Sequence, residues 1–194
     1  TAVNILSFDD GAAPHLGAPS RFNSPFHSAV MAKSYRPIMS TLGYVLSPER
    51  RRVLMTYRVF RNDDDQFGKY NGIGGHMESD EDIAACMIRE IKEEAGITPT
   101  AMSLRGTVNW TGFGPKGEDW LAFIFLVHAF SGEPAQASNE GPLQWVDIDK
   151  ITSLPIWEGD RYFLPLVFDD DPRPFHGFLP YDHDRPLGWS YTRI

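Results

Sequence analysis

Residues 75–97 read GHMESDEDIAACMIREIKEEAGI, and small or apolar residues recur within them at helical spacing. The recurring residues are Ile83, Ala84, Met87, Ile88, Ile91 and Ala95. At about 100° per residue they fall on one side of a helix. We therefore predict a helix over residues 80–95, with Ser79 or Asp80 as its N-terminal cap and acidic residues in its first turn. Gly96 should end this helix, because glycine tolerates a left-handed backbone.

Three glutamates near the end of the predicted helix share one edge of it. Glu90, Glu93 and Glu94 are spaced i, i+3 and i+4, so their carboxylates are neighbours. Like charges this close destabilise a helix, and the adjacent Arg89 cannot neutralise all three. Hard divalent cations such as Mg²⁺ bind through a few carboxylates together with substrate phosphates. The run therefore predicts either a magnesium site or a solvated acidic helix face.

The residues around the three glutamates favour the magnesium site. Gly72, Gly74 and Gly75 precede the helix, at a place where the backbone must approach another group closely. The pattern G-x5-E-x7-R-E-U-x-E-E-x-G-U, in which U is a bulky aliphatic residue, is matched at every fixed position. These positions are Gly75, Glu81, Arg89, Glu90, Ile91, Glu93, Glu94, Gly96 and Ile97. The segment resembles the Nudix box of the Nudix (MutT-like) hydrolases, and so many constraints at set spacing make a chance match improbable.

The composition is that of a folded domain. The chain has 194 residues, of which 42% are hydrophobic and 13% aromatic, enough to form a substantial core. Its net charge of −8 argues against binding to nucleic acid polymers or acidic membranes. The one cysteine suits a reducing cytoplasm, and we find neither a signal peptide nor an apolar run long enough to span a membrane. We expect a cytoplasmic monomer or homodimer.

Prolines, glycines and serines interrupt residues 1–36, which we interpret as an N-terminal extension or arm. The hydrophobic pattern of the remaining residues, 37–194, predicts strands and one further helix. The strands are expected at residues 38–46, 52–59, 104–111, 120–128, 143–147, 175–179 and 189–193, and the helix at 157–168. Strands mixed with two helices suggest an α/β sandwich. The Nudix resemblance covers roughly residues 37–194 and implies the same α/β (α+β) fold, an α/β/α sandwich with a mixed β-sheet.

Outside the box, the chain is similar to the branch of the family that hydrolyses oxidised purine nucleoside triphosphates, of the human 8-oxo-dGTPase type. The similarity lies in residues 69–75, 157–166, 175–178 and 191–193. It implies that the base is held by residues matching Thr41, Asn71, Trp110, Trp157 and Asp160. An amide can donate and accept at a purine edge, an indole offers a stacking face, and a carboxylate can pair with ring N–H groups.

Two departures from the branch pattern bear on base preference. Gly159 replaces the first aspartate of a Trp-x-Asp-Asp stretch, and the second pocket phenylalanine of the third strand falls at Gly112. Both departures are compatible with a pocket for a purine. They put a preference for 8-oxoguanine in doubt. The alternative to a pocket is ordinary structure, in which Trp157 belongs to the core, Asn71 caps a turn and Thr41 is a strand residue.

The resemblance implies hydrolysis of a nucleoside triphosphate to a monophosphate and pyrophosphate. It places Mg²⁺, with Mn²⁺ as a possible substitute, on Glu90, Glu93, Glu94, Glu140 and the carbonyl of Gly74. Glu93 or Glu140 is then the candidate general base, and Arg89 orients the glutamates through charge-assisted hydrogen bonds. Arg58 could contact phosphates, although a solvated arginine is the simpler interpretation of that residue. Glu140 has a similar alternative, as an exposed loop glutamate.

Three functions fit these patterns. The first, which we favour, is a pyrophosphohydrolase that removes oxidised purine nucleotides from the nucleotide pool. The second is a Nudix hydrolase for another nucleoside diphosphate linked to a group X, such as ADP-ribose, a dinucleotide or a nucleotide sugar. The third is a sensor with the same fold that binds a nucleotide without cutting it. Retention of every box glutamate argues against the sensor.

Overall fold

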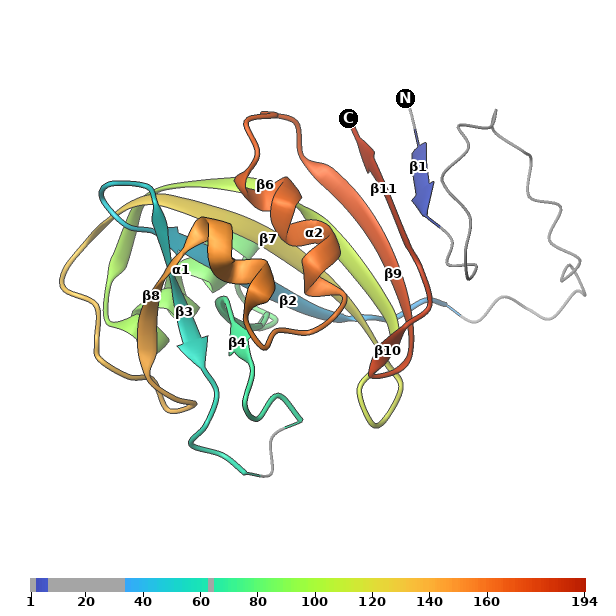
Figure 1. The fold of residues 1–194 in the computed structure, drawn as a ribbon, viewed down its shortest axis with the longest axis horizontal. Helices are drawn as coiled ribbons and strands as arrows, with labels where there is room; N and C mark the ends of the chain where they lie inside the picture. Colours follow the sequence, from blue (N-terminus) through green and yellow to red (C-terminus); the bar gives the residue numbers. More distant parts are fainter. Residues whose placement is uncertain (1–2, 7–33, 63–64) are drawn as a thin grey trace, which may run out of the picture.

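The computed structural model describes residues 3–6, 34–62 and 65–194. Within these residues eleven strands form one strongly curved mixed sheet (Figure 1). The elements are β1 (Val3–Leu6), β2 (Ile38–Leu46), β3 (Arg52–Tyr57), β4 (Tyr70–Asn71), β5 (Ile73–His76), α1 (Ile83–Ala95), β6 (Thr98–Phe113), β7 (Glu118–Ser131), β8 (Leu143–Asp147), a 3₁₀ helix η1 (Ile148–Ser153), α2 (Asp160–Phe168), β9 (Phe175–His183), β10 (Arg185–Pro186) and β11 (Trp189–Arg193).

The main path through the sheet is β1-β11-β9-β6-β7-β2-β3-β4, and β10, β5 and β8 pair with β9, β2 and β3 respectively. The pairs β2–β7 and β6–β9 are parallel, and the other pairs are antiparallel. The sheet is therefore mixed, as expected. None of the helices in the described ranges is long and apolar enough to cross a membrane.

Alternate residues of the central strands enter two separate cores. In β2, Tyr44 and Leu46 join one cluster while Val45 joins the other, and β3 and β7 alternate in the same way. The first cluster contains Phe163, Leu164 and Val167 of α2, and the second contains Met87, Ile91 and Ala95 of α1. Because successive side chains of a strand point to opposite faces, α1 and α2 cover opposite faces of the sheet. The predicted sandwich is confirmed.

The predicted start of the first helix is wrong by three residues. Asp82, and not Ser79 or Asp80, is the cap, because its Oδ1 accepts hydrogen bonds from the N–H groups of Ala84 and Ala85 at 2.8 and 2.9 Å. The first turn of α1 therefore contains no acidic residue. The end of the helix is confirmed: Gly96 has φ 71° and its N–H donates to the Lys92 carbonyl at 3.0 Å.

The strand predictions differ from the structure mainly at their ends. Residues 38–46, 143–147 and 189–193 are strands with the predicted bounds. β6 and β7 are longer than predicted, because they pair with each other along most of their length across four register shifts. The predicted strand 52–59 ends at Tyr57, and α2 begins at Asp160 instead of residue 157.

Most of the predicted extension, residues 1–36, lies outside the described residues. Its described part includes β1, which pairs antiparallel with β11 and so adds a strand to the sheet (Figure 1). A boundary between an extension and a domain at residue 37 stays a prediction.

Candidate functional site

Strand β5 brings the glycine run directly against two other elements. It pairs antiparallel with β2, where Gly74 lies opposite Leu42 and Gly75 opposite Thr41. A Cβ atom on Gly74 would lie 2.1 Å from the Thr41 carbonyl oxygen, and one on Gly75 would lie 2.5 Å from Oε1 of Glu90. A side chain at either position would displace the neighbouring group. The absence of side chains here allows the backbone to reach the carboxylates of α1, as the sequence predicted.

Arg89 holds three of the glutamates of the box in place. Its Nε and one terminal nitrogen donate to the two oxygens of Glu81 at 3.0 and 2.7 Å. Its other terminal nitrogen donates to Glu90 at 2.7 Å and to Glu93 at 3.3 Å. Glu81 also accepts the Glu78 backbone N–H at 2.9 Å, and the hydrogen bonds from Arg89 hold the pKa of Glu81 down to about 2. This fork-to-carboxylate geometry fixes the loop before α1 against the helix.

Glu94 is a partly buried carboxylate of the box. Burial, followed by the charges of Glu140 and Glu90, raises its pKa to about 8, although a hydrogen bond from the Gly74 backbone and the charge of Arg58 act in the opposite direction. Arg58 also forms an ion pair with Glu140. The carboxylates of Glu90, Glu94 and Glu140 thus lie near one another, and the charged form of Glu94 is destabilised. A bound divalent cation would stabilise the charged forms.

The donor set therefore fits a hard cation in its chemistry: carboxylates and a nearby backbone segment, with no thiolate. The side chains are not already arranged around a common point, since the described part of the chain contains no group of three or more His, Cys, Asp or Glu side chains with metal-binding geometry. Arg89 contacts Glu90 and Arg58 contacts Glu140 instead.

A cleft of about 250 Å³ opens beside the glycine run, and it gathers residues from several elements. All six residues predicted to bind substrate line it, together with two of the predicted metal ligands: Thr41, Arg58, Asn71, Trp110, Trp157 and Asp160, with Gly74 and Glu140. The side chains of Arg89, Glu90, Glu93 and Glu94 do not line it. The cleft and the acidic edge of α1 therefore meet at β5 and Glu140.

Phe113 is an aromatic wall of the cleft that the sequence prediction missed. The branch pattern has its second pocket phenylalanine at the position of Gly112, but the register between β6 and β7 shifts between Trp110 and Phe113. Gly112 has φ 70°, and a Cβ atom there would lie 2.7 Å from the Tyr181 carbonyl oxygen. In a regular strand, residues two apart share a face. The bulge adds one residue, so that Phe113 shares the cleft face with Trp110. The cleft therefore keeps two aromatic residues from this strand, although position 112 itself is a glycine.

Tyr181 of β9 is a second lining residue that the sequence prediction missed. Its ring packs edge-on to Phe113 with the centroids 4.8 Å apart, and Phe113 packs edge-on to Trp157 at 5.0 Å. With Trp110, these residues surround the cleft with aromatic surface. No local pattern marks Tyr181, because β9 reaches the cleft only through its parallel pairing with β6.

Two buried side-chain atoms of residues that line the cleft have no hydrogen-bond partner among the described residues. Among the described residues, Oδ1 of Asn71 and Nε1 of Trp157 are buried without a hydrogen bond, while Nδ2 of Asn71 donates to Gln66. Burial raises the pKa of Asp160 to about 7. Buried polar groups are normally satisfied, so these atoms indicate a ligand with polar edges.

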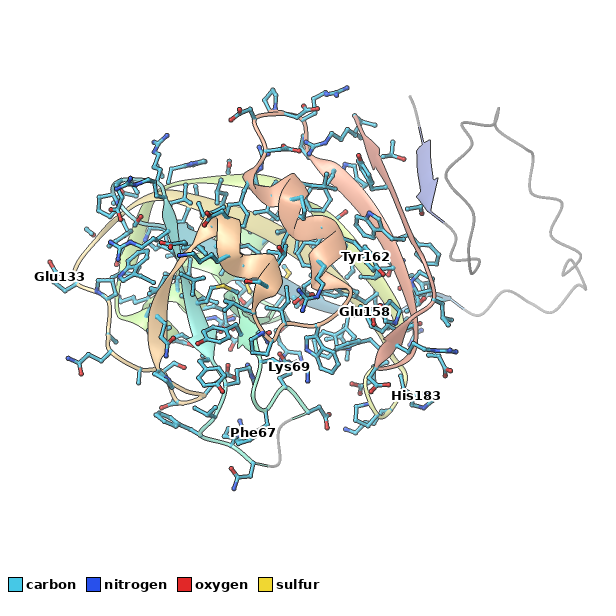
Figure 2. The ribbon with its side chains drawn as sticks, viewed as in Figure 1. Phe67, Lys69, Glu133, Glu158, Tyr162 and His183 are labelled. Carbon is cyan, nitrogen blue, oxygen red and sulfur yellow. The ribbon has the colours of Figure 1, made fainter. Side chains whose placement is uncertain are left out.

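A lysine lies over one of the aromatic rings that line the cleft. The ammonium nitrogen of Lys69 lies 4.2 Å from the ring centroid of Trp157, in a cation–π contact. In Figure 2 Lys69 lies in the loop before β4, close to the turn that leads into α2. Together with Arg58, Lys69 places cations beside a cleft in a protein whose net charge is −8.

Thr41 connects the cleft to α1. Its Oγ1 lies 3.3 Å from Sγ of the buried Cys86, and burial raises the pKa of that thiol to about 11. Cys86 is therefore a neutral packing residue in contact with Thr41.

Comparisons with known proteins agree with this geometry. A sequence model of the NUDIX domain matches residues 37–167. The oxidized purine nucleoside triphosphate hydrolase of Danio rerio is 32% identical over 145 residues, which are 74% of this chain and 87% of that protein. The Mus musculus protein of the same description is 29% identical over 79% of this chain and 94% of its own length. The crystal structure of a MutT protein from Bacillus halodurans superposes with a TM-score of 0.69 at 26% identity, covering 80% of this chain and 97% of that chain.

Proposed function

Because the chain belongs to the Nudix family of hydrolases, we propose that it is a Mg²⁺-dependent pyrophosphohydrolase that acts on oxidised purine nucleoside triphosphates. The products would be the nucleoside monophosphate and pyrophosphate. One observation carries this proposal: an aromatic cleft with unpaired polar atoms opens directly onto the glycine run and Glu140 of the acidic site. A base in the cleft would then have its phosphates beside the carboxylates.

The aromatic walls support binding of a flat base. Trp110, Phe113, Trp157 and Tyr181 offer faces and edges to a purine ring, and aromatic contacts of this kind stabilise a bound ring beyond the area that they bury. Oδ1 of Asn71 can accept from the base and Nε1 of Trp157 can donate to it. The names of the fish and mouse relatives, which cover most of this chain, support an oxidised purine as the substrate.

The acidic site supports the hydrolytic step. Glu90, Glu93, Glu94 and Glu140, with the backbone of Gly74, are the residues that would hold Mg²⁺ or Mn²⁺, whose chemistry is to neutralise phosphate charge and to acidify a bound water. Arg89 keeps Glu81 and Glu90 in position. Glu140 lines the cleft whereas Glu93 does not, so Glu140 is the better candidate for accepting a proton from the attacking water. Arg58 and Lys69 would attract the phosphate chain toward the site.

A second candidate function rests on a separate pair of rings. His76 and Trp120 also line the cleft, and their centroids are 5.0 Å apart. A second ring beside the glycine run would suit a substrate with a further planar group, such as a dinucleotide or ADP-ribose. We propose the oxidised purine triphosphate first, since such substrates need only one ring site.

In either case we propose a cytoplasmic monomer or homodimer.

The test is a Mg²⁺-dependent hydrolysis panel in which the products are identified. It compares 8-oxo-dGTP, 2-hydroxy-dATP, the ordinary dNTPs, ADP-ribose and a dinucleoside polyphosphate. The proposal expects monophosphate and pyrophosphate from an oxidised purine, at a far higher kcat/KM than from its normal parent. Faster cleavage of ADP-ribose or the dinucleotide would move the assignment to the second candidate. Nucleotide binding without any cleavage would make the chain a sensor.

A further inference from the structure

The hydroxyl of Tyr181 lies against the backbone of Gly159, next to Asp160, and we call the part of the cleft lined by Tyr181 and Asp160 its floor. A Cβ atom on Gly159 would lie 2.0 Å from the hydroxyl oxygen of Tyr181 and 2.7 Å from Cδ2 of Leu179. Cβ atoms essentially never make contacts this short, so a side chain at residue 159 would require Tyr181 and Leu179 to move. The hydroxyl therefore fills the space in which a side chain of residue 159 would begin.

The Tyr181 hydroxyl is held in place and keeps its proton. Tyr181 is only 6% exposed, and the Gly159 backbone faces its hydroxyl oxygen. Burial, and after it the charge of Asp160, raises the pKa of the phenol far above its ordinary value. Since the backbone N–H of Gly159 is a donor, the oxygen accepts it and the O–H remains available to donate.

Asp160 provides the complementary acceptor beside this donor. It begins α2, lines the same cleft as Tyr181, and is close enough to raise the pKa of the phenol. The described residues provide no hydrogen bond to its carboxylate. The cleft floor thus presents one acceptor and one neutral donor side by side, where an aspartate at position 159 would have presented two carboxylates.

We propose that Tyr181 is a specificity-determining residue and that it reads, together with Asp160, a lactam edge of the base, in which a ring N–H is adjacent to a C=O. Asp160 accepts the N–H, and Tyr181 donates to the carbonyl oxygen. This inference rests on the proposed function and names the chemical feature of the substrate that the cleft would select. Oxidation of a purine at C8 creates such an edge, because the ring nitrogen next to C8 gains a hydrogen while C8 becomes a carbonyl. Guanine and hypoxanthine carry another lactam in the six-membered ring.

Binding of nucleoside monophosphates separates these possibilities without any need for catalysis. dAMP has no lactam, dIMP has one in the six-membered ring, and 8-oxo-dAMP has one in the five-membered ring. Equilibrium dissociation constants are measured for the full chain and for Tyr181→Phe, which removes only the hydroxyl. Tyr70→Phe is the matched control, because its hydroxyl donates to Gln144 outside the cleft.

The proposal expects Tyr181→Phe to weaken 8-oxo-dAMP roughly 3- to 15-fold while leaving dAMP unchanged, the loss typical of one hydrogen bond to an uncharged group. Selective weakening of dIMP instead would assign the lactam of the six-membered ring as the edge that is read. Equal weakening of all three ligands, or no weakening, would overturn the proposal. Thermal melting of each variant checks the fold. If the wild-type chain hydrolyses no nucleoside triphosphate, the proposed function fails, but these binding differences still decide the role of Tyr181.

Discussion

Replacing Asp160 by asparagine should stabilise the protein at neutral pH while impairing its proposed base recognition. Burial raises the pKa of Asp160 from 3.8 to about 7. Between pH 3.8 and about pH 7, the carboxyl group is therefore protonated in the folded chain but ionised in the unfolded chain. Below about pH 4 the group is neutral in both states and contributes no difference. As the pH rises toward 7 the wild type loses stability, and the loss is complete above the folded pKa.

The size of this effect follows from the shift. One pKa unit corresponds to about 1.4 kcal/mol, so the full shift sets a ceiling of about 4 kcal/mol on the loss. Because the carboxylate borders an open cleft, where solvent relaxes the penalty, we expect about half of this ceiling, roughly 2 kcal/mol. Asp160→Asn keeps the shape and removes the charge. The variant should therefore match the wild type near pH 4 and exceed it by roughly 2 kcal/mol at pH 8.

Urea denaturation in the presence of EDTA, at intervals from pH 4.5 to 8.5, measures this difference in the free energy of unfolding. Glu158→Gln is the matched control, since Glu158 is an exposed carboxylate two residues earlier in the chain, and its effect should not vary in this way. A difference between Asp160→Asn and wild type that stays constant with pH would refute the reasoning. It would mean that the cleft floor does not destabilise the charged carboxylate.

Three further predictions concern the acidic site and its glycines. Glu93→Gln and Glu94→Gln should each lower kcat at least about a hundredfold and leave the circular dichroism spectrum unchanged. Glu133→Gln, at an exposed residue, is the control. Full activity of both variants would remove the metal assignment. Arg89→Lys should lower kcat by roughly 10- to 100-fold, because lysine cannot replace the two-pronged contact with Glu81; unchanged kcat would show that this contact does not position the glutamates. Gly74→Ala should destabilise the fold by roughly 2–4 kcal/mol, since its Cβ atom would lie 2.1 Å from a backbone oxygen; a melting temperature equal to wild type would contradict the packing of β5 on β2.

Local patterns were sufficient to predict the acidic edge of α1. The spacing of its glutamates, the glycine at its end and the glycine run before it are all features of neighbouring residues, and helical geometry alone relates them. Strands β2, β8 and β11 were predictable for the same reason, because short apolar or β-branched runs bounded by turn residues carry their own signal. The start of α1 was not predictable in this way, since four acidic or polar residues compete for the cap position. The contact of Glu81 with Arg89 keeps Glu81 out of the helix.

The chemistry of the cleft depended on contacts between residues far apart in the chain. The sequence alone identified the family pattern, the acidic site and six residues that line one cleft. The tertiary structure decided that a bulge at Gly112 turns Phe113 into the cleft, that the hydroxyl of Tyr181 occupies the space beside Gly159, and that Arg58 pairs with Glu140. Each of these depends on strand register or on packing across the sheet. A short sequence motif specifies its own backbone geometry, but strand register is set by the pairing partner, which lies elsewhere in the chain.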